Sequence, residues 1–580
     1  MLNRYYEEEL GHLRQLAAEF SHAHPALAPM LAGPSSDPDV ERVLEGVAFL
    51  AGLIRQRLDR EFPEFIQSLG NMIFPHYIRV IPSCTIVTFN PKGRLNEPAK
   101  VAAGVELASN PVDGTACVFR TCYPVEVQPI TLRDTRVIAD AGTQPRLRLT
   151  FALDVGDVGT LRATALRLHL AGEITEATNL YLLLRQYLTG IMVAAPGGEA
   201  ALLPAAALRP VGFADEDTLI PYPPHAYPGY RLLEEYFVLP QKFLFVEIGG
   251  LEHWRNRGKS TQFTLDFMLK ELPGWMGPVR PEAFVLNATP AINLFNAEAE
   301  PVSLDHRASE YRLLPAGRQR THYQIFSVDE VTGRQPGVSA PRVYTPLGLF
   351  RGDGAAAEDD EMTVYQVVTR LANIGRGLES YLSIAYQPQR VPQPEILSVR
   401  LTCTNGVLPV SLGIGDISRP TDTSPERLVF ANIMPPTPPL NPPMGEALLT
   451  RILSHLALNY LSIANAPNLK SLLNLYIFAQ AQGEDAAIAN RRRIEGLQEM
   501  EVRAGSRIVS GALMRGQNII LKCRQDYFAC RGDLYLFGCI LNEFLSDYAA
   551  INCYTRFGLE ELLSGDKYQW PERIGQQPLL

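Results

Sequence analysis

The segment that comes nearest to a phosphate-binding loop is Arg257-Gly258-Lys259-Ser260. A Walker A loop needs a further glycine five residues before Gly258, so that the backbone can curl around the phosphate. That position is His253, and the nearby glycines, Gly249 and Gly250, stand elsewhere. We therefore interpret this segment as an ordinary loop between two strands and not as a nucleotide site.

A second glycine pattern, Gly413-Ile414-Gly415, follows a predicted strand. A dinucleotide site needs a helix directly after such a pattern, because the helix N-terminus holds the pyrophosphate. The chain continues instead with Asp416, Ser418 and Pro420. These residues predict a bend.

The sequence shows no motif that would place metal ligands or a catalytic nucleophile close together. His22 and His24 would diverge on a helix, and no HExxH motif or paired His/Cys set supplies the three or four ligands of a metal site. No G-x-S-x-G elbow is present. His455, one turn before Asn459, is interpreted as an interface or core histidine. We predict no catalytic residue, cofactor or metal, and an enzyme of unrecognised type stays as an alternative that no motif supports.

Composition and charge narrow the class of protein. A chain of 580 residues is long enough for three or four domains at ~150 residues each. The net charge of −9 disfavours nucleic acid as a partner, since phosphate backbones attract basic surfaces. We find no secretory signal in MLNRYYEEEL and no run of ~18 apolar residues that would insert into a membrane. Eight cysteines without a CxxC pair fit reduced thiols, so we expect a cytoplasmic protein.

Apolar periodicity predicts helices at both ends and strands between them. Near the N-terminus apolar residues recur every three or four positions, and Pro63 is predicted to end the second helix. The period then becomes two, with turn residues between the runs, which is typical of antiparallel sheets. Two loops, 194–230 and 352–361, are predicted to be loose. We predict an α+β, multidomain protein with the boundaries 1–80 (helical), 81–235 and 236–410 (both β-rich), 411–445 (a proline-rich arm) and 446–580 (α/β).

The stretch from Pro435 to Leu461 joins a dense run of prolines to an amphipathic helix. Proline fixes φ and lacks an amide donor, so the run cannot be a helix or a central strand. We expect an extended, semi-rigid arm. An arm that carries an apolar helix is more typical of a scaffold subunit than of an active site.

Four segments spread over nearly the whole chain carry a more specific pattern. They are Tyr5-Tyr6-Glu7 with Leu10, Leu13, Phe20 and His24-Pro25; Asp37-Pro38-Asp39-Val40-Glu41-Arg42 with Phe62-Pro63-Glu64; Leu401 to Asn405 with Pro436-Thr437-Pro438-Pro439 and Leu453-Ser454-His455-Leu456; and Arg515-Gly516 with Leu536-Phe537-Gly538 and Trp570-Pro571. Together, in this order and spacing, they resemble the TssF family of type VI secretion baseplate subunits.

The resemblance implies a non-catalytic wedge component of a contractile injection machine. Two copies would clasp one TssG, and the wedge would also carry TssE and trimers of TssK. Six wedges would surround the VgrG hub at the cytoplasmic face of the inner membrane, with only indirect contact to the membrane complex. The baseplate would support sheath and tube assembly and trigger contraction. A wedge protein of a related phage-tail-like particle is the nearest alternative.

We expect the contacts with other subunits to involve the N-terminal helices, the proline-rich stretch and the helix after it. These helices offer more apolar surface than each can bury by itself. The expected interface residues are Tyr5, Tyr6, Leu10, Leu13, Phe20, Pro436, Pro438, Pro439, Leu449, Leu453, His455 and Tyr460.

Overall fold

The computed structural model is α+β and multidomain, as predicted, and divides into two units. The first unit comprises Met1–Ile73 and Pro443–Ile452, and the second comprises Phe74–Pro442 and Leu453–Leu580. The structure describes residues 2–23, 38–95, 97–140, 142–222, 228–317, 319–338, 340–347, 364–372, 377–385, 393–444, 446–457, 465–477, 484–509, 512–547, 549 and 553–575.

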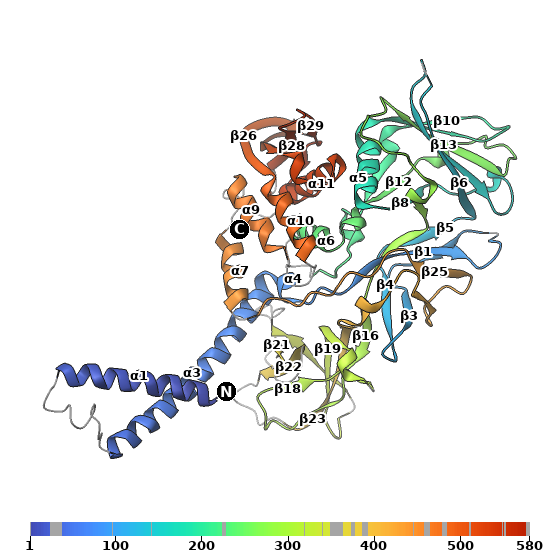
Figure 1. The fold of residues 1–580 in the computed structure, drawn as a ribbon. Coiled ribbons are helices and arrows are strands. Elements are labelled where there is room, and N and C mark those ends of the chain that lie inside the picture. The colour runs from blue at the N-terminus through green and yellow to red at the C-terminus, as the bar shows by residue number, and fades with distance from the viewer. Residues whose placement is uncertain are drawn as a thin grey trace. The chain divides into compact units, whose positions relative to one another are not determined.

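Two long helices form the first unit as a hairpin. α1 spans Leu2–Ala23 and α3 spans Pro38–Ile73, and the two run in opposite directions (Figure 1). The prediction that Pro63 ends the second helix is wrong, because α3 continues to Ile73. A proline removes one amide donor but leaves the turns on either side free to form, so the 36-residue helix persists.

The second unit contains a six-stranded sheet whose strand β1 packs against a core on each face. The order is β24-β3-β4-β15-β1-β25, and each pairing in it is antiparallel. Along β1 successive side chains point to opposite faces. Cys84 and Ile86 enter one core with Phe245, while Val87 and Phe89 enter another. The strands are β24 (Ile417–Pro420), β3 (Glu106–Val112), β4 (Thr115–Thr121), β15 (Ala288–Ile292), β1 (Cys84–Pro91) and β25 (Leu428–Asn432).

Two further antiparallel sheets share this part of the unit (Figure 1). The five-stranded sheet consists of β10 (Ala201–Pro204), β9 (Leu188–Ala194), β13 (Gln262–Leu269), β7 (Arg146–Leu153) and β6 (Ile130–Ile138). The four-stranded sheet consists of β11 (Leu208–Val211), β12 (Phe245–Ile248), β8 (Leu166–Leu170) and β14 (Phe284–Leu286), and β2 (Ala99–Val101) pairs with β5 (Val125–Val127).

An eight-stranded sheet encloses a third core. β23 (Glu395–Thr404), which pairs with β16, β17 and β19, contributes Leu397, Val399, Leu401 and Cys403 to that core. The remaining strands are β16 (Phe295–Glu298), β17 (Val302–Leu304), β18 (Tyr311–Leu313), β19 (Gln324–Arg334), β20 (Arg342–Pro346), β21 (Val364–Leu371) and β22 (Leu378–Ala385).

The C-terminal part of the second unit packs helices against a small mixed sheet. α11 (Arg531–Asp547) is buried along most of its length and lies beside α5 and α6 (Figure 1). The other helices are α4 (Pro75–Ile78), α5 (Ile174–Leu182), α6 (Pro228–Val238), α9 (Ala466–Leu475) and α10 (Glu484–Glu495). The strands are β26 (Leu497–Val509), β27 (Ala512–Cys523), β28 (Cys553–Glu561), β29 (Lys567–Gln569) and β30 (Arg573–Ile574).

The proline-rich stretch is extended, and its backbone is held by the chain segment before β1. Ile81 and Leu440 exchange two backbone hydrogen bonds of 2.9 Å, and the Thr437 amide donates to the Cys84 carbonyl at 2.8 Å. The stretch begins later than the predicted arm, since β24 and β25 occupy much of 411–432. It leads to α7 (Glu446–Ala457). The boundaries predicted inside the second unit remain predictions.

The two segments predicted to be loose loops have different outcomes. The first, 194–230, contains β10 and β11, where Leu203, Leu208 and Val211 are buried. That prediction is wrong, because strand pairing to β9 and β12 overrides the Ala/Pro-rich composition. The second, 352–361, lies outside the described residues. Within the part of the chain that is described, no helix is both long and apolar enough to cross a membrane.

Candidate interaction surface

The two helices of the hairpin touch through small residues. Ala17 on α1 and Ala48 on α3 are buried, and Gly52 approaches the α1 backbone so closely that an added Cβ would lie 3.2 Å from the Tyr6 amide nitrogen. Leu10 is the large apolar side chain that is buried with them. Small residues at a helix crossing let the two axes come close together. The larger apolar residues therefore have to lie elsewhere on the two helices.

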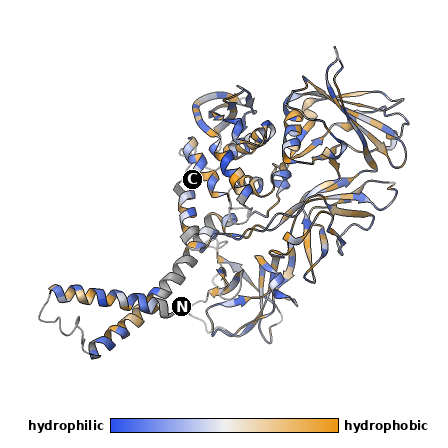
Figure 2. Cartoon of the chain, viewed as in Figure 1, coloured by the Kyte–Doolittle hydropathy of each residue, from blue (hydrophilic) through white to orange (hydrophobic). Residues whose placement is uncertain are grey.

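Those larger residues form an exposed stripe along α3. Val43, Val47, Leu50 and Ile54 follow one another at intervals of three or four residues, which places them on one face of the helix. Their exposed fractions are 64%, 46%, 60% and 62%. Figure 2 shows hydrophobic and hydrophilic residues alternating along α1 and α3. A set of adjoining exposed apolar side chains marks an interaction site on a soluble protein.

The same arrangement continues on α1 and on the neighbouring positions of α3. Leu16 and Phe20 on α1 are 51% and 46% exposed, and Phe49 and Leu53 on α3 are also exposed. We call the eight residues Leu16, Phe20, Val43, Val47, Phe49, Leu50, Leu53 and Ile54 the hairpin surface. Burying each large side chain contributes about 1.5–3 kcal/mol before ordering costs. The hairpin surface thus has the chemistry of an interface that another chain covers.

Ion pairs hold the register of the hairpin without burying the surface. Arg55 donates to Glu9 at 2.6 Å, and Arg14 donates to Glu41 at 2.5 Å. All four side chains are at least partly exposed, so each pair contributes about 0–1 kcal/mol. These pairs select the relative position of α1 and α3 more than they stabilise it.

The predicted interface residues differ in their solvent exposure. Among those on α1, Phe20 is exposed, Tyr5, Tyr6 and Leu13 are half-buried, and Leu10 is buried. The others divide in the same way: Pro438 and Leu453 are exposed, Pro439 and Leu449 are half-buried, Pro436 and His455 are buried, and Tyr460 lies outside the described residues. The set as a whole remains a prediction, and Phe20 is its member on the hairpin surface.

His455 belongs to an aromatic cluster inside the second unit. Its ring centroid lies 4.9 Å from that of Phe74, 5.2 Å from those of Tyr77 and Tyr230, and 5.5 Å from that of Tyr476. Contacts of this kind are typical of core packing. The position of His455 is therefore that of a core residue, which is one of the two interpretations that the sequence left open.

A second histidine of the cluster, His76, is hydrogen bonded on both sides. Its Nδ1 is 2.9 Å from the Tyr222 hydroxyl, and its Nε2 is 3.1 Å from the Tyr476 hydroxyl. Burial, reinforced by His455 and Arg79, lowers the pKa of His76 to about 3. The neutral ring donates one hydrogen bond and accepts the other. It joins α4 to α9 and does not titrate near neutral pH.

Two of the thiols and one buried carboxylate have surroundings that favour a structural role. Burial raises the pKa of Cys122 and of Cys403 to about 12, so these thiols are protonated and poor nucleophiles. The buried Glu235 accepts hydrogen bonds from the amides of Leu219 and Ile220 and from Lys242. No group of three or more His, Cys, Asp or Glu side chains suited to a metal ion occurs in the described parts of the chain.

Residues 1–577 match the family model described as "Type VI secretion system, TssF". The chain belongs to the TssF family. A curated relative, type VI secretion system component TssF1 of Pseudomonas aeruginosa PAO1, is 30% identical over 625 aligned positions, which cover 100% of this chain and 99% of the relative. The family resemblance inferred from the four sequence segments is thereby confirmed.

Two solved structures are similar to this TssF-family chain. A chain of the TssK-TssF-TssG baseplate subcomplex of a type VI secretion system has a TM-score of 0.81 and 30% identity, covering 92% of this chain and 98% of that one. A chain of a baseplate complex from the type VI secretion system has a TM-score of 0.61 and 26% identity, covering 100% of both. The fold is thus that of a TssF-family subunit.

Sequence reasoning missed most of the hairpin surface. Apolar spacing in the sequence predicts that the second helix buries a stripe made of Val40, Leu44, Val47, Ala51, Ile54 and Leu58. In the structure Val47 and Ile54 are exposed, whereas Ala48 and Gly52 are buried. The signal was present, since α3 carries small residues along one stripe and large apolar residues along another. Two apolar stripes on different faces of one helix indicate that two different elements pack against it.

Proposed function

We propose that this chain is a structural wedge component of a type VI secretion baseplate, and that its hairpin surface binds helices of neighbouring subunits. The observation that carries the proposal is the set of eight exposed large apolar residues on α1 and α3. The similarity to a chain of the solved TssK-TssF-TssG subcomplex supports TssG and TssK as partners. A second TssF-family copy as a partner follows from the family resemblance.

The finer parts of the proposal follow from the family resemblance. Two copies would bind one TssG, and the wedge would also hold TssE and border the VgrG hub on the cytoplasmic side of the inner membrane. The protein would support sheath and tube assembly and take part in triggering contraction. Its role would be non-catalytic. The protonated thiols and the neutral, doubly hydrogen-bonded His76 support this view.

Co-expression with the cognate TssG tests the proposal. The intact chain is expected to co-purify with TssG as one complex on a sizing column. Leu50→Asp and Phe20→Asp each place a charge in the hairpin surface and are expected to weaken the complex by roughly tenfold to a hundredfold, since about 1.4 kcal/mol corresponds to tenfold. Separate monomers from the unmodified chains would contradict the proposal.

A matched control comes from the second unit. Leu202 is 74% exposed on β10, so Leu202→Asp makes the same chemical change outside the hairpin. This variant is expected to form the complex as the unmodified chain does. If Leu202→Asp weakens the complex as much as Leu50→Asp, the effect is not specific to the hairpin surface and our assignment of that surface is wrong.

A further inference from the structure

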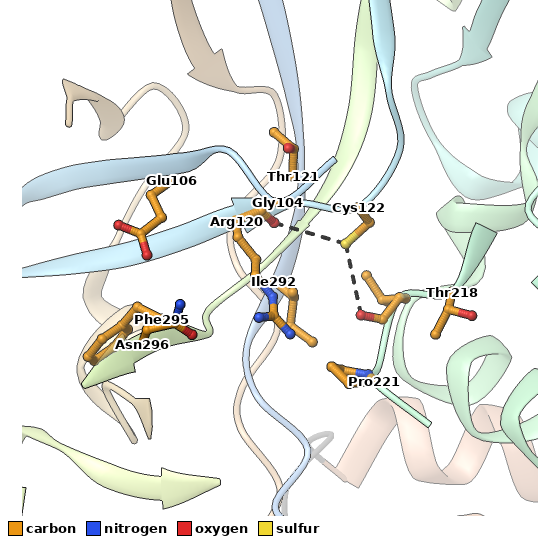
Figure 3. A pocket seen from close by; sticks show the side chains of 11 residues that line it. Gly104, Glu106, Arg120, Thr121, Cys122, Thr218, Pro221, Ile292, Phe295 and Asn296 are labelled. Atoms are coloured by element: carbon orange, nitrogen blue, oxygen red, sulfur yellow. Dashed lines mark hydrogen bonds between the residues drawn. The ribbon is translucent and has the colours of Figure 1, made fainter. Parts of the chain in front are cut away.

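A cavity of about 280 Å³ lies in the second unit, beside the central six-stranded sheet. Its walls come from the ends of β3 and β4, from the loop after residue 217, and from the start of β16 (Figure 3). The eleven lining residues include one cation, Arg120, and one carboxylate, Glu106. The charges of these two side chains determine what the cavity can hold.

Arg120 has no partner among the described residues of the chain. It is half-buried on β4, and its guanidinium group points into the cavity (Figure 3). Glu106 stands directly opposite it in the register of β3 and β4. Although the two residues are cross-strand neighbours, Figure 3 shows the Glu106 carboxylate set apart from the guanidinium group. A guanidinium group offers five donors in a planar fork that matches a carboxylate.

The other walls do not compete with an anion for Arg120. Burial raises the pKa of Cys122 to about 12, so its thiol is neutral, and Sγ is directed to the carbonyls of Arg120 and Leu219 at 4.0 and 3.9 Å. The Thr218 hydroxyl already donates to the Asp215 carbonyl and accepts from Arg231. The cavity therefore presents one planar cationic group with its hydrogen-bonding capacity unused.

Charge and size favour a single carboxylate over a phosphate group or a nucleotide. A phosphate would bring up to two negative charges next to Glu106, in a chain whose net charge is already −9. Pockets for drug-sized ligands or cofactors typically have volumes of about 300–1,000 Å³. A cavity at or below that range suits one acidic side chain better than a nucleotide.

The edge of β16 indicates that the bound carboxylate is a side chain of another protein chain. Phe295 and Asn296, which line the cavity, begin β16, and β16 is the last strand on its side of the eight-stranded sheet. The Glu298 carbonyl at the far end of β16 already accepts a hydrogen bond from the Ala316 amide at 2.8 Å, so the open part of this edge is at Asn296, beside the cavity. An open strand edge can accept the backbone of an extended segment. We infer that the cavity, which we call the Arg120 socket, receives one Asp or Glu side chain from an extended segment of another protein chain.

Binding of short peptides to the purified full chain tests the socket directly. The probe is the fluorescein-labelled, blocked pentapeptide Ala-Val-Glu-Val-Ala, compared with its Gln counterpart by fluorescence anisotropy. The Glu peptide is expected to bind at least tenfold more tightly than the Gln peptide, because the carboxylate forms charge-assisted hydrogen bonds with Arg120. Equal affinity of the two peptides, or no binding of either, would overturn the inference.

Variants of Arg120 test whether its guanidinium group binds the carboxylate. Competition by small anions tests whether the carboxylate has to belong to a protein chain. Arg120→Gln is expected to lose the preference for Glu, and Arg120→Lys, which keeps the charge but not the fork, to lose part of it. The control Arg209→Gln, at an exposed arginine on β11, should bind as the unmodified chain does. Acetate that displaces the peptide at equal concentration would overturn the protein source, and phosphate that does so would overturn the carboxylate class.

A second experiment, which rests on the proposed function, measures association with the baseplate partners. It distinguishes a failure of the Arg120 socket from a failure of the proposed function. Arg120→Gln is expected to weaken association with the co-expressed baseplate partners TssG and TssK at least tenfold, with an unchanged thermal unfolding midpoint. If Arg120→Gln assembles normally while Leu50→Asp does not, the socket is overturned and the proposed function stands. If the unmodified chain also fails to assemble, the proposed function is overturned, and the peptide measurements decide the socket alone.

Discussion

The helical hairpin and the β-rich unit use their apolar residues in opposite ways. In the second unit the large side chains Phe89, Phe119 and Phe245 are fully buried between sheets. In the hairpin, by contrast, the small residues Ala17, Ala48 and Gly52 are buried, while the eight large apolar residues of the hairpin surface are exposed. The second unit can therefore be stable by itself. The hairpin leaves these large apolar side chains exposed, which is why we propose that another chain covers them.

The buried ion pair of α6 offers the largest effect in the second unit. Lys242→Met removes the partner of Glu235, whose side chain is 0% exposed, and leaves that carboxylate buried. Breaking a buried pair in this way costs about 3–5 kcal/mol. We expect urea unfolding to shift accordingly. Fluorescence of Trp254, Trp275 and Trp570 is the measurement, since all three tryptophans lie in this unit.

A double variant provides the control for this ion pair. Glu235→Gln removes the charge but keeps an oxygen that can accept from the amides of Leu219 and Ile220. Combined with Lys242→Met, it is expected to recover much of the lost stability. A double variant as unstable as Lys242→Met alone would mean that the buried charge is not the cause.

The stability of the second unit should also depend on pH through Glu543 on α11. Burial raises the pKa of Glu543 from 4.5 to about 7, with Asp547 adding to the increase and Arg573 and Asn542 opposing it. The folded state holds this proton more tightly than the unfolded chain does. Its stabilising contribution is thus complete below about pH 4.5 and is lost as the pH rises through about 7, a change of roughly 3 kcal/mol.

Glu543→Gln is expected to flatten this part of the stability–pH profile between pH 4.5 and 7.5, as followed by thermal unfolding at each pH. The exposed Glu499 provides the matched change, and Glu499→Gln should leave the slope as it is. A profile that keeps its slope in Glu543→Gln would exclude Glu543 as the source.

A smaller effect is expected where α11 meets α5. A Cβ added at Gly532 would lie 2.2 Å from the backbone carbonyl atoms of Thr178, so one of the two helices must shift. Overpacking of this kind costs about 1–3 kcal/mol. Gly532→Ala should therefore lower the tryptophan-detected stability. Unchanged stability would mean that the two helices are less closely packed than the structure indicates.

The smallest expected change in stability is in the hairpin, and it is a stabilisation. Gly46 on α3 has no atom within 4 Å of an added Cβ. Gly46→Ala is expected to stabilise the helix by about 0.5–1 kcal/mol, because alanine loses less backbone freedom in a helix. Far-UV circular dichroism of thermal unfolding measures the change, and the tryptophan signal should stay the same. Destabilisation would mean that this face of α3 is covered by other parts of the chain.

Much of the architecture was predictable from local pattern. Apolar spacing in the sequence predicts a strand at 146–153 and a helix at about 532–550, and the structure has β7 at Arg146–Leu153 and α11 at Arg531–Asp547. Such elements are predictable because the period of a buried face depends on the type of element alone. The helix across Pro63 and the strands within 194–230 were not predicted. In both cases local composition favours an interruption, and contacts with the rest of the chain decide otherwise.

The sequence by itself determined which residues share a face, which segments are helices or strands, and the family pattern that spans the chain. Only the tertiary structure decided which face is covered. On α3 the small stripe at Ala48 and Gly52 faces α1, and the large stripe at Val43 and Leu50 faces outward. The physical reason is that helical period places residues on a face, but burial depends on what packs against it, and sequence alone does not locate that neighbour. The same holds for Arg120, whose cavity is formed by β4 together with segments distant in the chain.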